Sequence, residues 1–397
     1  MRTVEFDAVV VGTGPAGSAS ALVAAKKGLK VLVIERGPEP GSKTVSGAMI
    51  RIDEVGKVFG TDIPIERQVK RFKVIIANGG DRVNLDFPVS GLGTVGRRKF
   101  DAWMSSKAEA AGAVVITKTS VTGIKRTEGG IKVLTDRGEI STGRVVLAEG
   151  ANPILSMSLR IRDDLTPEDA VQTAKEVYSM PQTEVTKRMG LSADTDGEVW
   201  RVIYVNKTFG AGFLYTYKDA IAIGAGAPMK SMIEKKYQPN VMIEDFKEDL
   251  GLKQLLSGTS LREYSAKIIP ESGFPYCKAG IDNVYLAGDA IGLVNPLTFD
   301  GIGPAIASGV IAGNAVAEGW DPRKYEEALK YDPLIKSVIS SRKLVKQLLS
   351  TGEKYVTLLP EIMKRWASGD LYGIRELVSE NAWTILKDLT LLMQVRK

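Results

Sequence analysis

The residues best suited to chemistry lie in a glycine-rich loop near the start of the chain. An apolar run at 6–11 is followed by Gly12-Thr13-Gly14-Pro15-Ala16-Gly17 and then by a small-residue stretch at 18–27. Glycines at these spacings permit a tight turn, bring backbone N–H groups close to a pyrophosphate and let a helix pack tightly against a strand. The N-terminus of that helix adds a positive dipole for the same anion. The loop therefore predicts a dinucleotide-binding turn.

An acidic residue follows where the ribose of such a cofactor is expected. Glu35 comes directly after a second apolar run at 31–34, and its carboxylate can accept hydrogen bonds from ribose hydroxyl groups. A 2′-phosphate at this position would meet the negative charge of Glu35. Although Arg36 comes next, we expect an unphosphorylated ribose, as in FAD or NAD, with both residues at the site.

A second glycine-containing segment, far along the chain, favours FAD over NAD. The apolar run 284–287 ends in Gly288 and Asp289, and a helix is expected to begin near Gly301. A carboxylate after a strand can bind the ribityl hydroxyl groups of a flavin, and a helix N-terminus can face the ring edge where negative charge develops on reduction. Because a flavin dinucleotide extends beyond the first loop, the two segments together predict FAD.

Two further segments are expected to complete the site. Arg97 precedes a helix expected over 99–111, and its guanidinium can reach the phosphates or the ribityl chain of FAD. The turn Ala148-Glu149-Gly150 follows a strand and is expected to cover the adenine side. The chemistry would then be that of the flavin itself, so we predict no proton-transferring catalytic residue and no metal ligand.

The elements that position these residues alternate between strands and helices. The segment 6–35 has the pattern of a strand, a crossover helix and a parallel strand, and both strands are apolar throughout, as burial on two faces requires. Strand-like runs at 72–77 and 83–87, joined by a turn at 78–81, predict an inserted antiparallel sheet. Past Asp321 the apolar residues recur at helical spacing.

Two features of the composition exclude whole classes of mechanism. The chain has 397 residues, with no histidine and one cysteine, Cys277. Without histidine it cannot use Ser-His or Cys-His catalysis, bind a metal through imidazole or attach a flavin through histidine. One thiol supplies neither a dithiol pair nor the roughly four thiolates of an iron–sulfur cluster. We interpret Cys277 as a packing residue.

The charge distribution indicates a mildly basic surface without a nucleic-acid-binding arm. Lys and Arg number 53 against 47 Asp and Glu, a net charge of +6, and the basic residues are scattered along the chain. Such a surface suits anionic lipid or an acidic partner protein. The helical tail carries apolar residues beside lysines and arginines, and we interpret it either as a cap over the core or as a face for a membrane surface or partner subunit. The absence of a secretory pattern at the N-terminus predicts a cytoplasmic location.

In combination these segments resemble the FixC family of FAD flavoproteins, which are similar to the electron-transfer-flavoprotein:quinone oxidoreductases. The resemblance extends from residue 3 to about residue 320. The segments that carry it are Phe6 to Gly17, Ile34 to Gly37, Gly41 to Gly47, Arg97 to Trp103, Gly212 to Thr216, Glu263 to Glu271 and Leu286 to Asp289. The wider clan includes geranylgeranyl reductases, which usually carry Pro-Cys-Gly near the position of Gly41 to Gly47, and aromatic-ring hydroxylases.

The resemblance implies a fold and a set of cofactor contacts. The fold is expected to be α/β, with a glutathione-reductase-like Rossmann FAD domain, an inserted sheet-containing α+β domain and a helical C-terminal region. The FAD domain is expected at 1–70, 96–155 and 275–325, the substrate, quinone or partner domain at 71–95 and 156–274, and the helical region at 326–397. Contacts to non-covalent FAD are expected from Gly12, Gly14, Pro15, Ala16, Gly17, Glu35, Arg36, Lys43, Ser46, Gly47, Arg97, Ala148, Glu149, Gly150, Gly288, Asp289, Pro296, Gly301, Ile302 and Gly303.

The resemblance also implies a function and partners. Such a chain takes electrons from electron-transfer flavoprotein subunits and passes them to a membrane quinone, directly or through a ferredoxin-like iron–sulfur subunit, while lying peripherally on the inner face of the cell membrane. The iron–sulfur cluster would belong to that separate subunit, because this chain has one cysteine.

Two alternative functions stay open. One is a stand-alone geranylgeranyl (prenyl-lipid) reductase, with a deep substrate tunnel near Phe213 and Tyr215. The other is a structural subunit whose FAD does not turn over, which predicts a flavin sealed from solvent. A quinone oxidoreductase should instead show an apolar, basic-rimmed patch that leads toward the flavin.

Overall fold

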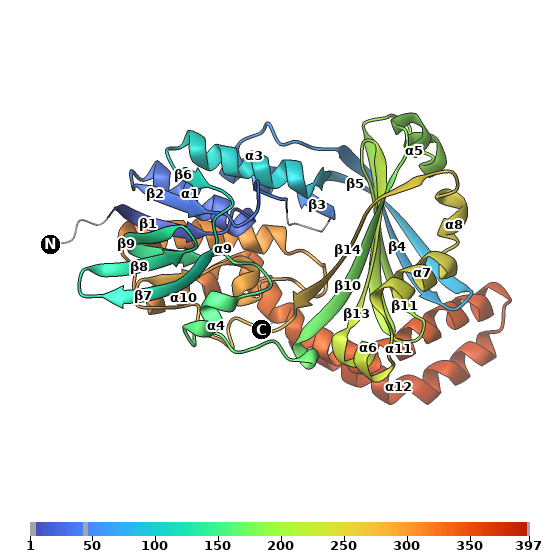
Figure 1. Cartoon of the computed structure of the whole chain (residues 1–397). Helices are drawn as coiled ribbons and strands as arrows, with labels where there is room; N and C mark the ends of the chain where they lie inside the picture. Colours follow the sequence, from blue (N-terminus) through green and yellow to red (C-terminus); the bar gives the residue numbers. More distant parts are fainter. Residues whose placement is uncertain (1–4, 43–46, 395–397) are drawn as a thin grey trace. The chain divides into compact units, whose positions relative to one another are not determined.

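The chain folds into two compact units, each built on its own sheet (Figure 1). The computed structural model describes residues 5–42 and 47–394. Unit 1 comprises Met1–Pro64, Val95–Asp169 and Ile269–Ile339, and unit 2 comprises Ile65–Thr94, Ala170–Ile268 and Ser340–Lys397. The segment 326–397, expected as one helical region, is thus shared between the two units.

Unit 1 contains a mainly parallel sheet with the strand order β15-β16-β9-β1-β2-β6. These strands are β1 (Phe6–Val11), β2 (Val31–Ile34), β6 (Val114–Ile116), β9 (Gly138–Leu147), β15 (Gly280–Ile281) and β16 (Val284–Leu286). β1 pairs in parallel with both β2 and β9, so that Ala8 lies opposite Val31 on one side and Arg144 on the other. The hairpin β7 (Val121–Thr127) and β8 (Gly130–Thr135) continues antiparallel from β9. All four residues of β2 are buried, as an unalternated apolar strand predicts.

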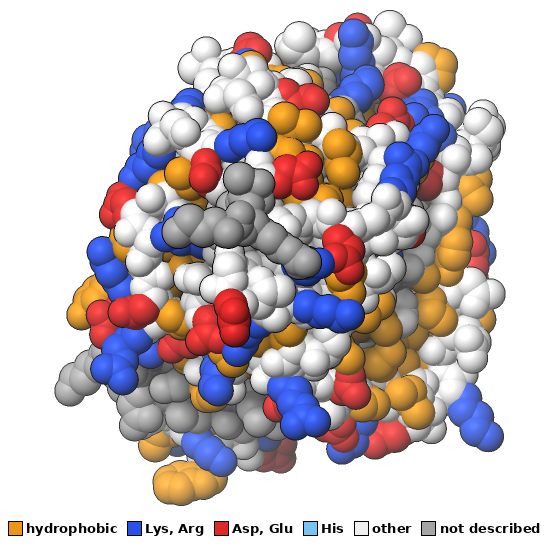
Figure 2. All heavy atoms as spheres, turned by 60° about the vertical axis from the view of Figure 1, so that its left-hand side comes forward, with side chains coloured by type: hydrophobic (Ala, Val, Ile, Leu, Met, Phe, Trp, Pro, Cys, Tyr) orange, Lys and Arg blue, Asp and Glu red, His pale blue; other side chains and the backbone are white. Residues whose placement is uncertain are grey.

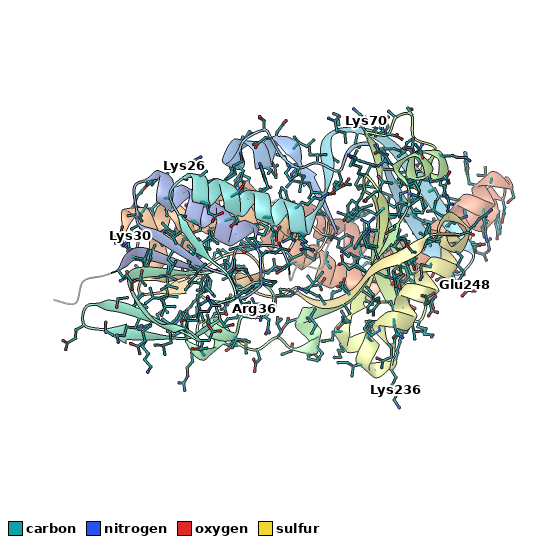
Figure 3. All side chains as sticks on the ribbon, turned by 45° about the horizontal axis from the view of Figure 1, so that its top comes forward. Lys26, Lys30, Arg36, Lys70, Lys236 and Glu248 are labelled. Carbon is teal, nitrogen blue, oxygen red and sulfur yellow. The ribbon has the colours of Figure 1, made fainter. Side chains whose placement is uncertain are left out.

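Two helices of unit 1 pack unusually closely. The helical segments of this unit are α1 (Pro15–Lys26), α2 (Ile52–Phe59), α3 (Arg97–Ala110), α4 (Ile154–Ser158), η1 (Pro167–Asp169), η2 (Gly288–Ile291), α9 (Ile302–Glu318) and α10 (Pro322–Tyr331). A Cβ atom at Gly309 of α9 would lie 2.3 Å from the carbonyl oxygen of Ala16 in α1. A Cβ atom at Gly313 would lie 2.7 Å from the carbonyl oxygen of Ser20 in α1. The contact therefore requires glycine. Lys26, at the far end of α1, and Lys30, directly before β2, are exposed (Figure 3).

Unit 2 contains a mixed sheet. Its strands follow the order β14-β10-β13-β12-β11-β4-β5. They are β4 (Arg67–Asn78), β5 (Asp81–Gly96), β10 (Ala170–Ser179), β11 (Asp196–Val205), β12 (Phe209–Thr216), β13 (Ala220–Pro228) and β14 (Ser260–Pro270). The short strand β3 (Gly47–Arg51) belongs to unit 1. The hairpin of β4 and β5 is antiparallel, as the sequence predicts, but β4 also pairs in parallel with β11. The predicted antiparallel hairpin is therefore present, but the sheet that contains it is mixed.

Helices cover one face of this second sheet. They are α5 (Gln182–Met189), α6 (Met229–Glu234), α7 (Pro239–Asp249) and α8 (Leu252–Leu255). The core between them and the sheet includes Val202, Leu214 and Ile223 from the strands and Met242 and Phe246 from α7, all fully buried. Lys236 and Glu248 mark the exposed side of this helical layer (Figure 3).

Two long helices end the chain, α11 (Pro333–Ala367) and α12 (Leu371–Gln394). Within unit 2, Asn78 of β4 donates a hydrogen bond to Thr357 of α11 at 3.2 Å. Tyr355 of α11 donates to Asp388 of α12. These side-chain contacts hold the helical pair to its own unit.

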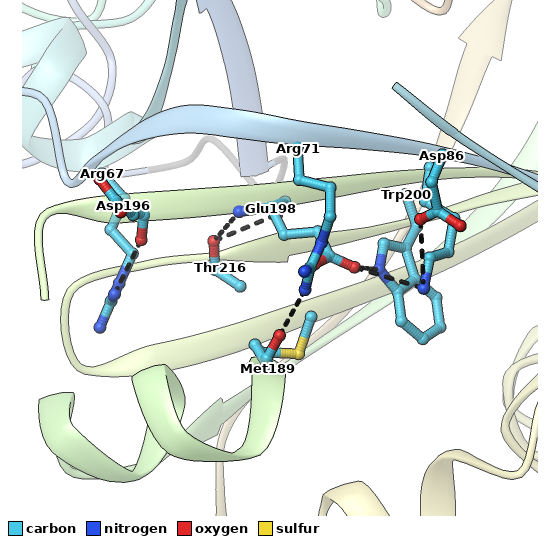
Figure 4. A network of polar contacts seen from close by, with 9 residues as sticks. Arg67, Arg71, Asp86, Met189, Asp196, Glu198, Trp200 and Thr216 are labelled. Carbon is cyan, nitrogen blue, oxygen red and sulfur yellow. Dashed lines mark hydrogen bonds and ion pairs between the residues drawn. The ribbon is translucent and has the colours of Figure 1, made fainter. Parts of the chain in front are cut away.

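A buried carboxylate lies at the parallel junction of β4 and β11 (Figure 4). The side chain of Glu198 is 1% exposed and forms an ion pair with Arg71. The Lys73 ammonium lies 3.7 Å from Glu198 and 3.6 Å from Asp86, and the Trp200 indole donates to Glu198. These groups neutralise the charge of Glu198 at the point where two strands from distant parts of the sequence meet.

A second buried ion pair joins α7 to β10. The Lys247 ammonium lies 2.8 Å from Glu176, 2.8 Å from the Tyr178 hydroxyl and 2.6 Å from Glu244, so all three of its hydrogens have acceptors. Burial by itself lowers the pKa of Lys247, but its hydrogen bonds with Glu176, Glu244 and Tyr178 raise the pKa overall. The side chains of Lys247 and Glu176 are each 7% exposed. This pair is therefore protected from water.

We expect Lys247→Met to destabilise unit 2 by about 3–5 kcal/mol, because it leaves the Glu176 carboxylate buried without its cation. Chemical denaturation monitored by circular dichroism measures the loss. Lys253→Met is the matched control, since Lys253 pairs with Glu248 in the open, with side chains 64% and 71% exposed. Equal stability of the two variants would show that the buried Lys247–Glu176 pair contributes no more to stability than the exposed Lys253–Glu248 pair.

Candidate functional site

The glycine loop before α1 leaves its backbone open on one side and tightly packed on the other. Gly12 has φ +101°, and a Cβ atom there would lie 2.4 Å from the carbonyl oxygen of Ala148. A Cβ atom at Gly17 would lie 1.9 Å from the carbonyl oxygen of Gly12. A Cβ atom at Gly14, by contrast, would have no other described residue within 4 Å apart from its own helix backbone and chain neighbours. The open space lies beside Gly14, at the start of α1.

The first turn of α1 has backbone N–H groups without a side-chain cap. Gly14 is the N-cap residue, Pro15 occupies the first helical turn, and within the described chain no side chain caps this end. The first N–H groups of a helix have no partner inside the helix and carry its positive dipole. Together with the open space at Gly14, this end of α1 is suited to bind an anionic phosphate.

The carboxylate of Glu35 lies next to the same loop. Its Oε2 accepts hydrogen bonds from the Thr13 backbone at 3.2 Å and the Thr13 hydroxyl at 2.8 Å, and its Oε1 accepts from the Gly37 backbone at 2.6 Å. These contacts fix the carboxylate beside the loop while its remaining lone pairs can accept from a ribose. The neighbouring Arg36 side chain is exposed (Figure 3).

The second glycine segment, which follows β16, packs against the first turn of α1. Gly288 begins η2 with φ +69°, and a Cβ atom there would lie 2.9 Å from Cβ of Ala16 and 3.4 Å from Cβ of Ala305. The Gly288 backbone donates to the buried Ser308 hydroxyl at 3.0 Å. Gly12 to Gly17, Gly288 and the first turn of α9 therefore converge within unit 1.

The N-terminus of α9 faces the Asp289 carboxylate. A Cβ atom at Gly301, the N-cap residue, would lie 3.7 Å from Oδ1 of Asp289. Asp300 accepts a hydrogen bond from the Gly303 backbone at 3.0 Å. The side chain of Ile302, which lies between these two residues in the sequence, is buried. The loop that leads into α9 is closed by Asn295, whose side-chain oxygen accepts from the Leu297 and Thr298 backbones at 3.0 and 3.1 Å. Pro296 is buried in this loop.

Arg97 is held by a carboxylate one turn later in α3. Its guanidinium binds Asp101 through two hydrogen bonds of 2.8 and 2.9 Å, and the Asp101 side chain is 1% exposed. A Cβ atom at Gly41 would lie 2.8 Å from Cα of Arg98, so the loop after Glu35 packs directly on the start of α3. This contact brings Arg97 to the part of unit 1 that contains Glu35.

Glu149 uses its side chain to begin the next helix. Its carboxylate accepts hydrogen bonds from the Leu155 and Ser156 backbones at 2.8 and 2.9 Å, at the start of α4. Burial raises the pKa of Glu149, although these hydrogen bonds oppose the rise. Ala148 continues β9 by donating to Val11 of β1 at 2.9 Å, and Gly150 has φ +77°. The carboxylate of Glu149 thus shapes the turn after β9.

Three of the sequence-predicted contacts to FAD lie at or next to the gap at residues 43–46 in the described chain. Lys43 and Ser46 lie outside the described residues, and Gly47 begins β3. Among the side chains that the structure describes, no group of three or more His, Cys, Asp or Glu residues could hold a metal ion.

Four side chains support the site without having been predicted from the sequence. Thr13 binds Glu35, Ser308 binds the Gly288 backbone, Asn295 closes the loop before α9, and Arg162 donates to the carbonyl oxygen of Asp289 at 2.9 Å. Thr13 lies inside the glycine loop, so its position in the motif could have indicated a role. Asn295 binds the backbone two and three residues later, a local turn that its position before Pro296 could have indicated. Arg162 and Ser308 bind backbone atoms distant in sequence, and such contacts have no local signature.

Comparison with known proteins identifies the group to which this site belongs. A family model described as pyridine nucleotide-disulphide oxidoreductase matches residues 6–157. Protein FixC of Bradyrhizobium diazoefficiens is 33% identical over 331 residues, which cover 78% of this chain and 75% of that protein. The chain belongs to the FixC family. It is an oxidoreductase that uses FAD, as the sequence predicts.

Solved structures share the fold. A geranylgeranyl bacteriochlorophyll reductase-like protein from Thermoplasma acidophilum matches with a TM-score of 0.74 at 19% identity, over 97% of this chain and 98% of that chain. A variant of halogenase PltM in complex with FAD matches with a TM-score of 0.67 at 15% identity, over 99% of this chain and 84% of that chain. The predicted α/β fold with a glutathione-reductase-like Rossmann domain is confirmed.

The geometry of unit 1 fits FAD at four points. The uncapped first turn of α1 and the open space at Gly14 suit a pyrophosphate, and the fixed carboxylate of Glu35 suits a ribose. The Asp289 carboxylate and the N-terminus of α9 lie together, as a ribityl chain and the electron-accepting ring edge require. Residues from both glycine segments are therefore placed to hold one extended dinucleotide.

We expect two alanine substitutions in the first loop to separate folding from cofactor binding. Gly17→Ala places a methyl group against the Gly12 carbonyl, so the apoprotein should lose roughly 1–3 kcal/mol of stability. Gly14→Ala meets no described atom, and its φ of −68° suits alanine, so the apoprotein should remain stable. The new methyl group would instead crowd the pyrophosphate and weaken FAD binding about 10- to 100-fold.

Thermal melting of the two apoproteins and fluorescence titration with FAD measure these effects. Gly56→Ala serves as the matched control, because Gly56 lies in α2 and a Cβ atom there also meets no described atom. If Gly14→Ala bound FAD as tightly as Gly56→Ala, the open space at Gly14 would not be the phosphate site.

The raised pKa of Glu149 predicts a pH dependence of stability. Because the folded protein holds the proton of Glu149 more tightly than the unfolded chain, this residue stabilises the fold below the ordinary glutamate pKa and loses that contribution as pH rises through the raised value. Stability of the parent protein relative to Glu149→Gln should therefore fall as the pH rises above the ordinary glutamate pKa of about 4.3. Chemical denaturation at a series of pH values tests this expectation, and a pH-independent difference would contradict it.

Proposed function

We propose that this chain accepts electrons from an electron-transfer flavoprotein and passes them to a membrane quinone, as one subunit beside a ferredoxin-like iron–sulfur protein. Membership of the FixC family and the resemblance to quinone oxidoreductases support the proposal. When bound, FAD supplies a centre that can accept or release electrons singly or in pairs. The chain then has to hold the flavin and bind an electron donor and a quinone. Neither task needs histidine, and the sequence has none.

The observation that carries the proposal is an apolar groove beside the N-terminus of α9. The groove has a volume of about 270 Å³. Its walls come from α2 and α9 and include Val55, Val58, Ile306, Val310 and Ile311. An apolar groove of this kind suits the prenyl tail of a quinone, because it removes hydrocarbon from water.

The groove reaches the residues expected beside the flavin ring. Ile302 and Gly303, in the first turn of α9, line it. Arg51 and Lys57 lie at its rim, and Arg51 is ion-paired with Glu54 at 2.6 Å and Asp300 at 3.0 Å. Glu54, Asp300 and Asp332 line the groove as well, so its charged rim is mixed and not purely basic. The apolar walls next to the first turn of α9 are the feature that supports a quinone here.

The single cysteine supports a separate iron–sulfur subunit. Cys277 is half-buried and is the one cysteine of the 397-residue sequence. Because a cluster needs roughly four thiolates, one-electron transfer through such a centre requires another protein. The proposal accordingly includes a ferredoxin-like partner.

An exposed apolar face on α12 supports peripheral contact with a membrane. One side of this helix, at Ile374, Leu377, Ile385 and Asp388, is half-buried or buried. The other side presents Leu371, Tyr372, Val378, Trp383, Leu386 and Leu389, of which Leu371 is 68% and Trp383 80% exposed. A helix with such a face can lie in the lipid interface. No helix among the described residues is both long and apolar enough to cross a membrane.

The charges on the face drawn in Figure 2 are mixed, which favours docking through apolar surfaces. Figure 2 shows basic and acidic side chains interspersed over the face that it draws, with hydrophobic side chains between them. Mixed charges of this kind create no strong field of one sign. We therefore assign docking to apolar faces with local cations.

We expect Val58→Trp to slow quinone reduction without slowing reduction of the bound FAD. The indole would fill the groove, so reoxidation by a short-chain quinone should slow at least about tenfold, equivalent to about 1.4 kcal/mol. The measurement is anaerobic stopped-flow absorbance, first with reduced electron-transfer flavoprotein as donor and then with quinone as acceptor. NADH and NADPH are included as alternative donors.

Val114→Trp is the matched control, because Val114 is 48% exposed on β6 and does not line the groove. Failure of the protein donor, with turnover by a small reductant and a prenyl lipid, would replace the proposal with a prenyl-lipid reductase. A flavin that no donor reduces would indicate a structural subunit. Equal quinone rates for Val58→Trp and Val114→Trp would remove the groove from the quinone path.

A further inference from the structure

A buried arginine outside the predicted motifs binds the backbone of the second glycine segment. Arg162 is 5% exposed. Its Nη1 donates to the carbonyl oxygens of Asp289 at 2.9 Å and Ala290 at 2.5 Å, and its Nη2 donates to that of Ser272 at 3.5 Å. Arg162 thus joins the segment after α4, the segment before Cys277 and the η2 turn, all within unit 1.

The guanidinium is kept charged in a buried place by these acceptors and by nearby acidic groups. Burial lowers the pKa of Arg162, whereas Cys277, Asp289, Glu149 and Asp169 raise it. An unpaired buried charge is costly, so the backbone carbonyl groups offset a large desolvation penalty. Arginine suits three carbonyl acceptors because its donors form a planar, rigid fork.

The η2 turn is fixed from two sides as a result. On one side Arg162 binds the carbonyl groups of Asp289 and Ala290. On the other, the Gly288 N–H donates to Ser308, and the Gly292 N–H closes the turn on the Asp289 carbonyl at 2.9 Å. Once the backbone of Asp289 is fixed in this way, the direction of its side chain is limited to a few rotamers.

That direction matters because the Asp289 carboxylate lies at the N-terminus of α9. Its Oδ1 would be 3.7 Å from a Cβ atom at Gly301. A small rotation of η2 would move the carboxylate away from the N-terminus of α9 and would disturb the packing of Gly288 against Ala16 of α1. The position of the Asp289 carboxylate therefore depends on the η2 turn, whose carbonyl groups at Asp289 and Ala290 are bound by Arg162.

We propose that Arg162 is a positioning residue for FAD: it fixes the backbone of Asp289 so that the carboxylate binds the ribityl chain. Arg162 itself donates to three backbone carbonyl groups and acts on FAD through Asp289. The proposal rests on FAD binding alone, so it holds or fails independently of the electron donor and of the quinone.

The test is a double-mutant cycle on FAD affinity. We expect Arg162→Met to raise the dissociation constant of FAD roughly 10- to 100-fold, as loss of a residue that orients a ligand-binding group does. Asp289→Asn should also weaken FAD. The double variant should bind FAD about as tightly as the weaker single variant, because both changes remove the same contact. Flavin fluorescence titration of apoprotein measures all three.

Arg160→Met is the matched control, because Arg160 is exposed and lies two positions away. The melting temperature of each apoprotein and of each FAD-bound protein separates general stability from cofactor binding. If Arg162→Met does not fold, Arg162→Lys, which keeps the charge but not the fork, should fold and weaken FAD by a smaller factor. The proposal is overturned if Arg162→Met or Arg162→Lys lowers the apoprotein melting temperature but binds FAD like Arg160→Met. Additive effects in the cycle would overturn it as well.

Discussion

The close packing of α1 against α9 is the constraint on which unit 1 depends. Gly309 and Gly313 allow the backbones of the two helices to approach until a methyl group at Gly309 would lie 2.3 Å from the Ala16 carbonyl. Interiors pack at high density and do not absorb such an overlap without backbone movement. The spacing between the helices therefore has a single solution, and larger side chains would separate them.

This constraint brings two positive helix ends to one place. The first turns of α1 and α9 both meet Gly288, through Ala16 and Ala305. The N-terminus of α1 leaves backbone N–H groups for a ligand beside the open space at Gly14. The N-terminus of α9, where Asp300 already accepts from the Gly303 backbone, brings its dipole beside Asp289. An extended dinucleotide has negative charge on its phosphates and, after reduction, on its ring, so one packing contact serves two electrostatic needs.

The parts of the structure that could be predicted from sequence are those set by local geometry. Gly12, Gly17 and Gly288 are required by close contacts or by positive φ, and the apolar runs of β1 and β2 by burial on two faces, so each leaves a readable pattern. The parallel pairing of β4 with β11 has no such pattern, because the partner of a strand is set by tertiary contacts. Arg162 was missed for the same reason: its acceptors come from residues 272 to 290, and an isolated arginine resembles a surface residue.

The parallel pair also imposes an order on folding. The hairpin of β4 and β5 can form early, since Asn78 pairs with Asp81 across a short turn. Its other edge must wait for β11, because Gln68 pairs with Asp196 and the intervening chain includes Val95–Asp169 of unit 1. Contacts so distant in sequence form slowly, and an unpaired edge strand invites aggregation in the meantime. During synthesis on the ribosome, this edge of β4 thus stays unpaired until β11, at the middle of the 397-residue chain, has emerged.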